Sequence, residues 1–223
     1  MYFELDETGQ LTEVGKKELG HEITCLDIAP IPEGKIRSRF LAVGDTNNTV
    51  RIYSLYPDEH FERLSSQMVS AQPRSLCMLT VPAHRDGDDS ESRDAFSLPS
   101  SSSSDTLFLS IGLQDGVLLR TVVDNVTGDI KDTRQRFLGS KPVHLHKIQM
   151  GNTVNMLARS TRCWLCYTHQ AKYFMTPLSY VPLQSATNFS SEQCPNGIVG
   201  FLDSSLRIFS IDRLGDTFNQ VLK

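Results

Sequence analysis

The stretch GDTNNTVRIYSL, residues 44–55, returns as GFLDSSLRIFSI at residues 200–211. Both copies read glycine, five residues, an aliphatic residue, Arg, Ile, an aromatic residue, Ser, and then Leu or Ile. Apolar residues that alternate with polar ones around a short polar turn are typical of a β-hairpin. The sequence therefore predicts the same hairpin at two places, 156 positions apart (200 minus 44).

Two weaker copies of the hairpin lie between this pair. The stretch LFLSIGLQDGVLLRTVV, residues 107–123, has its glycine at Gly112 and turns at an Asp-Gly dipeptide, a strong hairpin signal. We expect its turn to be one residue shorter than the first. The stretch VNMLARSTRCWLCYTH, residues 154–169, has Ala158 near the glycine position. The chain thus contains four related hairpins.

The spacing of the four copies defines a repeat. Their glycine positions are separated by 68, 46 and 42 residues, and an insertion at residues 82–105 accounts for 24 residues of the first interval. A period of about 40 to 50 residues built from short strands is typical of β-propeller blades, each a four-stranded sheet. Short apolar stretches before and after each hairpin supply the other strands. The predicted fold class is all-β, a β-propeller.

The number of repeats predicts an incomplete propeller. The N-terminal YFELDETGQLTEV, residues 2–14, is a further hairpin without two preceding strands, and we interpret it as the outer half of an earlier blade. We expect residues 1–223 to form part of one propeller, with about four four-stranded blades plus a half-blade. Because an open arc exposes strand edges and apolar faces, we expect the chain to belong to a longer multi-propeller protein.

The composition argues against several function classes. The net charge is −4 and the basic residues are scattered, so any RNA contact is expected to be indirect or weak. No apolar run approaches the ~20 residues of a membrane span, so we expect no membrane association. The chain has five cysteines, an odd number, which favours a reducing compartment such as the cytosol or nucleus.

The repeated glycines are candidate structural positions. Gly44, Gly112 and Gly200 each stand at the end of an apolar strand, just before a turn. The missing Cβ permits either a positive φ or the close approach of a neighbouring blade. We interpret them as packing positions.

The repeated arginines also have a structural interpretation. Arg51 and Arg207 occupy matched hairpin positions, and the shorter second turn predicts Leu118 at that position of the second copy. An arginine that is absent from one copy does not suit a catalytic ring. We expect the stems to pack and the charged heads to lie in water or to pair between blades.

Two short motifs resemble metal sites. Cys163 and Cys166 are three residues apart in a predicted strand, so their side chains point to opposite faces and do not share an ion. His144 and His146 are on the same face of a predicted strand, but the sequence shows no further ligands beside them. We expect no metal and no other cofactor, and interpret the histidines as a solvated or inter-blade pair with a weak pH-sensitive contact as the alternative.

The sequence contains no recognisable catalytic motif. There is no G-x-S-x-G elbow, phosphate-binding loop or H-E-x-x-H pair. Asp27, Asp45 and Asp129 are assigned to strand ends and turns, where Asp side chains bond to nearby backbone. We therefore predict no catalytic residues, no enzyme activity and no small-molecule substrate.

The insertion AHRDGDDSESRDAFSLPSSSSSD within residues 82–105 is polar, acidic and rich in serine. It contains too few apolar residues to offset the entropy of ordering, and we expect a disordered loop. Ser102, close to Asp105, is a candidate phosphorylation site; the alternative is a loop without a function of its own.

Several stretches together resemble one family. They are SRFLAVG with NTVRI, AQPRSLC, IGLQDGVLLRTV with VTGDIKDTR, LGSKPV, TPLSY, SEQCPNGIV and LGDTFNQ. The chain is similar to the large β-propeller subunit of the spliceosomal splicing factor 3b complex. That family is shared with the large subunits of the UV-damaged-DNA-binding complex and of cleavage and polyadenylation specificity factor. Cys163 and Cys166 stand where this resemblance leads us to expect serines.

The resemblance implies a three-propeller protein in which this chain forms the later part of the second propeller. It implies a nuclear, non-catalytic scaffold for protein–protein interaction in pre-mRNA splicing, at branch-site recognition. The implied partners are other splicing factor 3b subunits within a small nuclear ribonucleoprotein. The alternative is a paralogous scaffold that serves ubiquitin ligation and DNA repair, or mRNA 3′-end processing.

Overall fold

The computed structural model describes residues 1–6, 8–59, 61–81, 105–151, 153–169, 172–180 and 182–210. The predicted disordered insertion lies outside the described residues except for Asp105, and so does Ser102.

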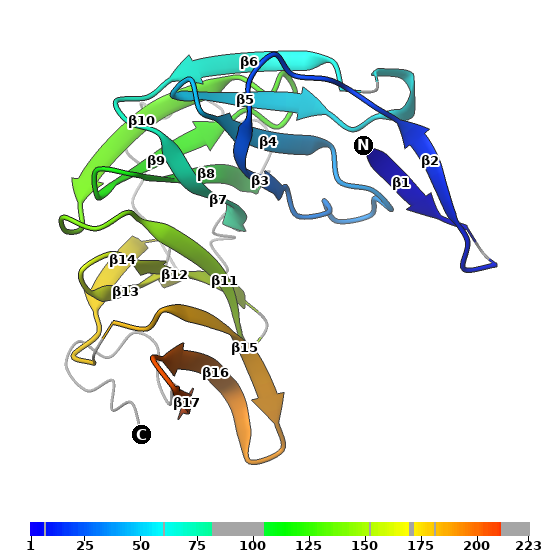
Figure 1. Cartoon of the computed structure of the whole chain (residues 1–223). Coiled ribbons are helices and arrows are strands. Elements are labelled where there is room, and N and C mark those ends of the chain that lie inside the picture. The colour runs from blue at the N-terminus through cyan, green and yellow to red at the C-terminus, as the bar shows by residue number, and fades with distance from the viewer. Residues whose placement is uncertain are drawn as a thin grey trace, which may run out of the picture.

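The described chain folds into an arc of successive antiparallel sheets (Figure 1). The N-terminal hairpin contains β1 (Tyr2–Leu5) and β2 (Leu11–Gly15). Blade I contains β3 (Ile23–Ile28), β4 (Phe40–Asp45), β5 (Thr49–Ser54) and β6 (Arg63–Met68), with the short 3-10 helix η1 (Pro57–Glu59) before β6. Blade II contains β7 (Pro73–Val81), β8 (Thr106–Leu113), β9 (Val117–Val123) and β10 (Ile130–Phe137).

The second half of the arc repeats the same order. Blade III contains β11 (His144–Met150), β12 (Thr153–Arg159), β13 (Cys163–His169) and β14 (Lys172–Pro177). Blade IV contains β15 (Ser185–Ser191), β16 (Cys194–Leu202) and β17 (Ser205–Ser210). Within each blade, each strand pairs with the next one in the chain, so every blade is a meander. The predicted partial propeller is confirmed, with three described strands rather than four in blade IV.

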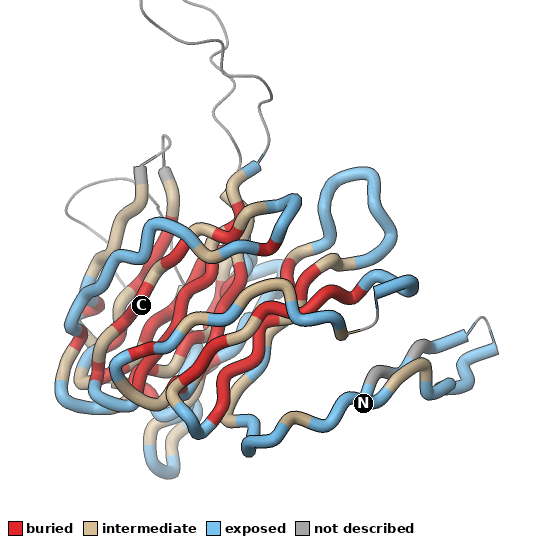
Figure 2. Tube along the Cα trace, turned by 90° about the horizontal axis from the view of Figure 1, so that it is seen from above, coloured by how far each residue is buried: buried red, intermediate tan, exposed pale blue. Residues whose placement is uncertain are grey.

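The hydrophobic core consists of three clusters, one at each junction between successive blades. The first joins blades I and II and includes Ile52 and Met78. The second joins blades II and III around Cys77 and Met156, and the third joins blades III and IV around Leu157 and Ile198. Figure 2 shows the buried segments along the stacked strands, whereas the N-terminal hairpin is largely exposed. Stability thus comes mainly from packing between repeats.

The strand alternation predicted for the two neighbouring cysteines is confirmed. Cys163 packs in the cluster between blades III and IV, whereas Cys166 packs in the cluster between blades II and III. Because the two thiols lie on opposite faces of β13, they do not converge on one ion.

The last described blade exposes an apolar face. Phe201, Leu206 and Ile208 are 44%, 72% and 50% exposed. Phe201 and Leu206 are cross-strand partners, and Ile208 is the partner of Val199. These side chains therefore share the face of blade IV that is turned away from blade III, where the described residues provide no further blade.

Candidate interaction surfaces

The concave side of the arc is formed by the first strand of each blade (Figure 1). These strands, β3, β7, β11 and β15, are the inner edges of their sheets, and we call them the inner wall. Because each pairs on one side only, some of its amide groups need partners outside the sheet.

Asp27 on β3 connects three blades across the inner wall. One carboxylate oxygen accepts a hydrogen bond from the Met78 amide of β7 at 2.6 Å, and the other accepts one from Lys147 Nζ of β11 at 2.8 Å. Lys147 also donates to the Ile28 carbonyl at 3.2 Å. The expectation that Asp27 bonds to nearby backbone was therefore wrong, because its partners lie on two other blades. Sequence reasoning missed this contact because the three residues come from three different repeats.

Two further side chains satisfy inner-edge amides across blade junctions. The Ser75 hydroxyl of β7 accepts from the Leu145 amide at 3.0 Å and donates to the Val143 carbonyl at 2.8 Å. Asn188 Oδ1 of β15 accepts from the Gln149 amide at 2.7 Å. With Asp27, these contacts join the inner strands of all four described blades.

Gly44 and Gly112 lie where the next blade approaches most closely. A Cβ at Gly44 would come within 2.8 Å of the Pro73 ring of blade II, and one at Gly112 within 2.4 Å of the Val143 carbonyl oxygen beside blade III. Neither glycine has a positive φ. Glycine is therefore required at these two positions by the close approach of the next blade and not by a positive φ.

Gly200 is not the structural counterpart of these glycines. Gly44 pairs with Val50 and Gly112 with Leu118, whereas Gly200 pairs with Arg207 and faces blade III. Only two residues separate β16 from β17, against three between β4 and β5, and this shifts the register by one. A Cβ at Gly200 would meet the Leu183 side chain at 2.5 Å, so this position is also tightly packed.

The register assigns the glycine position in blades III and IV to different residues. In blade I, Gly44 pairs with Cys25 on one side and with Val50 on the other, and these three residues form a row across the sheet on the face toward blade II. The corresponding central residue is Arg159 in blade III and Phe201 in blade IV. Ala158, expected at this position, faces blade II instead.

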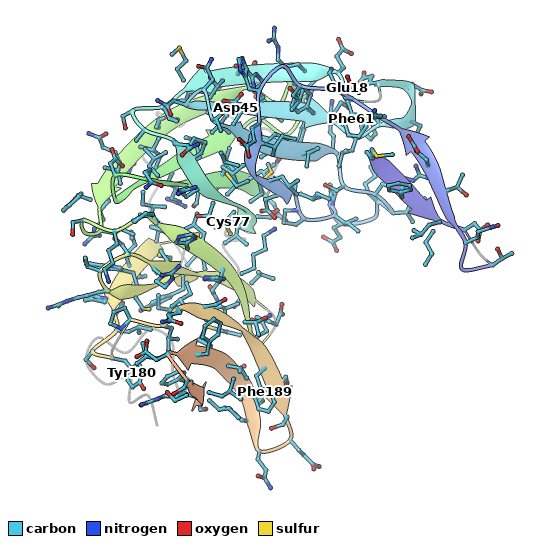
Figure 3. All side chains as sticks on the ribbon, viewed as in Figure 1. Glu18, Asp45, Phe61, Cys77, Tyr180 and Phe189 are labelled. Carbon is cyan, nitrogen blue, oxygen red and sulfur yellow. The ribbon has the colours of Figure 1, made fainter. Side chains whose placement is uncertain are left out.

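Arg51 and Arg207 have different surroundings. Arg51 forms an ion pair with Asp45, which is fully buried at the turn of its own hairpin (Figure 3). Asp45 also accepts hydrogen bonds from the Asn47 and Thr49 amides at 2.9 and 3.2 Å, as expected for an Asp in a turn. The expectation for Arg51 was wrong, because its charged head neither lies in water nor pairs between blades.

Arg207 is exposed and contacts the segment between blades III and IV. Its guanidinium donates to the Tyr180 hydroxyl and lies 5.5 Å from the centre of that ring. In the second hairpin, the turn is as long as the first, so Leu119 and not Leu118 corresponds to Arg51. The expected shorter turn was wrong.

An arginine between two aromatic rings joins blades II and III. The Arg120 guanidinium lies 3.7 Å from the centre of the Phe108 ring and 3.8 Å from that of Tyr173. Arg136 lies 5.1 Å from the centre of the Trp164 ring on the same junction. The sequence gives no signal for these contacts, because each aromatic partner on blade III is more than 25 positions away from its arginine.

The histidine pair lies at the junction of blades III and IV. His144 and His146 alternate along β11 on the face that also carries Ile148 of the third core cluster. Burial lowers the pKa of both imidazoles, and the positive charge of Arg159 lowers it further. Their placement on one face is as predicted. None of the described residues forms a group of three or more His, Cys, Asp or Glu side chains suited to a metal ion.

No helix within the described ranges is long and apolar enough to cross a membrane. The arc of antiparallel meander blades, three of them with four described strands, defines the protein as a β-propeller protein. Residues 1–211 match the family model described as the RSE1/DDB1/CPSF1 second beta-propeller. The chain belongs to this family.

The curated relatives include splicing proteins. The chain is 51% identical over 222 residues to spliceosome-associated protein 130 A of Arabidopsis thaliana, covering 100% of this chain and 18% of that protein. It is 46% identical over 222 residues to splicing factor 3B subunit 3 of Danio rerio, covering 99% of this chain and 18% of that protein. The chain therefore spans about a fifth of the length of these relatives.

A solved structure supports the fold alone. The crystal structure of BBS1N in complex with ARL6DN matches 91% of this chain and 56% of its own chain, with a TM-score of 0.53 and 15% sequence identity.

Proposed function

We propose that this protein acts in pre-mRNA splicing as a non-catalytic scaffold of the splicing factor 3b complex, at branch-site recognition. The observation that carries the proposal is the 46–51% identity to relatives named as splicing proteins, which extends over essentially the whole chain. The partners are the other subunits of that complex, and the location is the nucleus.

The contacts of the charged side chains support a structural role rather than catalysis. Asp45 and Arg51 fix a hairpin turn, while Asp27 and Lys147 connect blades. Catalysis requires groups that converge on a substrate, whereas these groups converge on one another. With a net charge of −4, the chain favours protein partners, and any RNA contact is indirect or weak.

The exposed face of blade IV supports the proposal that this chain is part of a longer protein. The matched family model describes a second propeller, and the relatives are about five times longer than the chain. We propose that residues 1–223 belong to one propeller and that further blades, supplied by the rest of the protein, cover Leu206 and Ile208.

Affinity purification of the full-length protein from nuclear extract tests the splicing role. Small nuclear RNA and proteins of the branch-site particle should copurify, in a complex that resists moderate salt. The alternative scaffolds of the same family, which serve ubiquitin ligation and DNA repair or mRNA 3′-end processing, would instead bring a cullin or cleavage factors. Recovery of either set without small nuclear RNA would contradict the splicing role.

A further inference from the structure

A group of basic side chains between blades III and IV has no acidic partner among the described residues. Arg159 lies opposite His144 in the β11–β12 register, and His146 follows on the same face. Among the described residues, no carboxylate lies within ion-pair distance of Arg159. The buried Arg159 Nε and His146 Nε2 atoms also have no hydrogen-bond partner. Three side chains that can donate hydrogen bonds thus face one junction, with no anion among the residues that the structure describes.

The elements packed against this group do not supply a counter-charge. β11 contacts β15 and β16, and neither strand contains a charged residue. Residues 178–184, which lead into β15, are also uncharged. The acid at the nearby β16–β17 turn, Asp203, accepts a hydrogen bond from Gln184 at 3.0 Å. On the other side, Arg74 of blade II adds positive charge next to His144.

The position of Arg159 explains why its side chain is only partly exposed. It stands in the row where Gly44 and Gly112 allow the next blade to pack closely, so the guanidinium is held at the blade junction. Leu157 and Cys163, which flank it on β12 and β13, line a small apolar hollow. A partly buried cation without a counter-ion is unfavourable, and an anion placed beside it would be stabilising.

We propose that Arg159, with His144 and His146, forms a receptor for a carboxylate side chain in an acidic segment of a partner protein. The apolar hollow beside Arg159 favours a peptide, which carries apolar groups next to its carboxylates, over an RNA backbone. The bidentate guanidinium matches a carboxylate, and the imidazoles donate further hydrogen bonds when protonated. This inference goes beyond the proposed function, because it holds whether or not the protein acts in splicing.

Binding of a fluorescent decaglutamate peptide to the full-length protein at low salt tests the proposal. Arg159→Gln should weaken binding by about tenfold to a hundredfold, the effect of losing one charge-assisted contact. The control Arg63→Gln removes an equal charge from the outer strand β6 and should leave binding unchanged. Binding should also tighten as the pH falls from about 7 to about 5.5, because a bound carboxylate raises the pKa of the histidines.

The outcomes separate the alternatives. Equal binding by wild type and Arg159→Gln, or equal losses for both variants, would overturn the proposal. Tighter binding of decauridylate than of the peptide would show that RNA is the occupant and would also overturn it. A second measurement uses the wild-type protein and so does not depend on the folding of a variant. Bound peptide should slow hydrogen exchange in β11 and β12. Protection confined to other strands would contradict the site.

Discussion

The third strands of blades I and IV, β5 and β17, have nearly the same sequence but differ completely in burial. Val50 and Ile52 of β5 are both 0% exposed, whereas the matched Leu206 and Ile208 of β17 are 72% and 50% exposed. Blade II covers β5, and no described blade covers β17. The comparison shows that in a repeat protein the neighbour, and not the local pattern, determines whether an apolar residue is buried.

The largest expected effect concerns the chain by itself. An uncovered apolar face of a few hundred Å² loses several kcal/mol at about 25 cal/mol per Å², comparable with the stability of a whole domain. We expect the isolated 223-residue chain to aggregate or to fold only partly, and the flanking sequence of the longer protein to give a cooperative monomer. Light scattering with thermal unfolding measures this. Sharp unfolding of a monodisperse chain would contradict it.

A solubility comparison sharpens that prediction. In the isolated chain, Leu206→Gln combined with Ile208→Thr should raise the monomer fraction, because both side chains lie on the uncovered face. The control Phe137→Gln changes a residue of β10 that is 65% exposed but lies on an outer strand. We expect a smaller gain for this control.

The second effect compares two isoleucines in the full-length protein. Ile52→Ala should lower local stability by about 2–5 kcal/mol, the usual loss for a buried isoleucine. If a further blade covers β17, Ile208→Ala should have a similar cost. Native-state hydrogen exchange of β5 and β17 reports each strand separately. A loss of under about 0.5 kcal/mol at Ile208 would mean that β17 stays exposed in the longer protein.

The third effect compares the two arginines. Arg51→Ala leaves the fully buried Asp45 carboxylate without its counter-charge and should cost about 3 kcal/mol. Arg207→Ala removes only an exposed contact with Tyr180 and should cost about 0.5 kcal/mol. Native-state hydrogen exchange in the full-length protein compares the two hairpins. Equal losses would show that Arg207 is also part of a buried network.

The smallest effect concerns the thiols. Burial raises the pKa of Cys77 to about 12 and that of Cys166 to about 11, whereas Cys194 is partly exposed. At about pH 8, a thiol reagent should modify Cys194 well before the other two.

The same two thiols give a pH dependence with a definite sign. Below the ordinary thiol pKa of 9.0, the thiols are protonated in both the folded and the unfolded protein, so the free energy of unfolding does not change with pH. From about pH 9 to about pH 11, the unfolded thiols ionise while the folded ones stay protonated, so the free energy of unfolding should fall. Cys77→Ala should flatten this dependence in chemical denaturation. An unchanged slope would argue against a raised pKa at Cys77.

The local pattern predicted each hairpin but not the contacts between blades. Turn residues and alternation placed the strands around Gly44 and Gly112, because these signals act within a few residues. The role of Asp27 was not predictable, since its partners Met78 and Lys147 lie 51 and 120 positions away.

The register of the later blades was not predictable either. One residue less between β16 and β17 moves Gly200 to the opposite face and places Phe201 in its row. Arg159 was not predicted for the same reason. The sequence pattern placed Ala158 near the glycine position, whereas the strand register places Arg159 there. The candidate site therefore became visible only through cross-strand pairing.

The side chains along the inner wall have a consequence for association with other chains. An exposed strand edge is a template for edge-to-edge addition of a foreign strand. Asp27, Ser75 and Asn188 already occupy the outward amides of Met78, Leu145 and Gln149. An incoming strand would have to displace a carboxylate, a hydroxyl and an amide before it could pair. The concave side therefore resists β-sheet growth, and aggregation of the isolated chain should proceed face to face through blade IV.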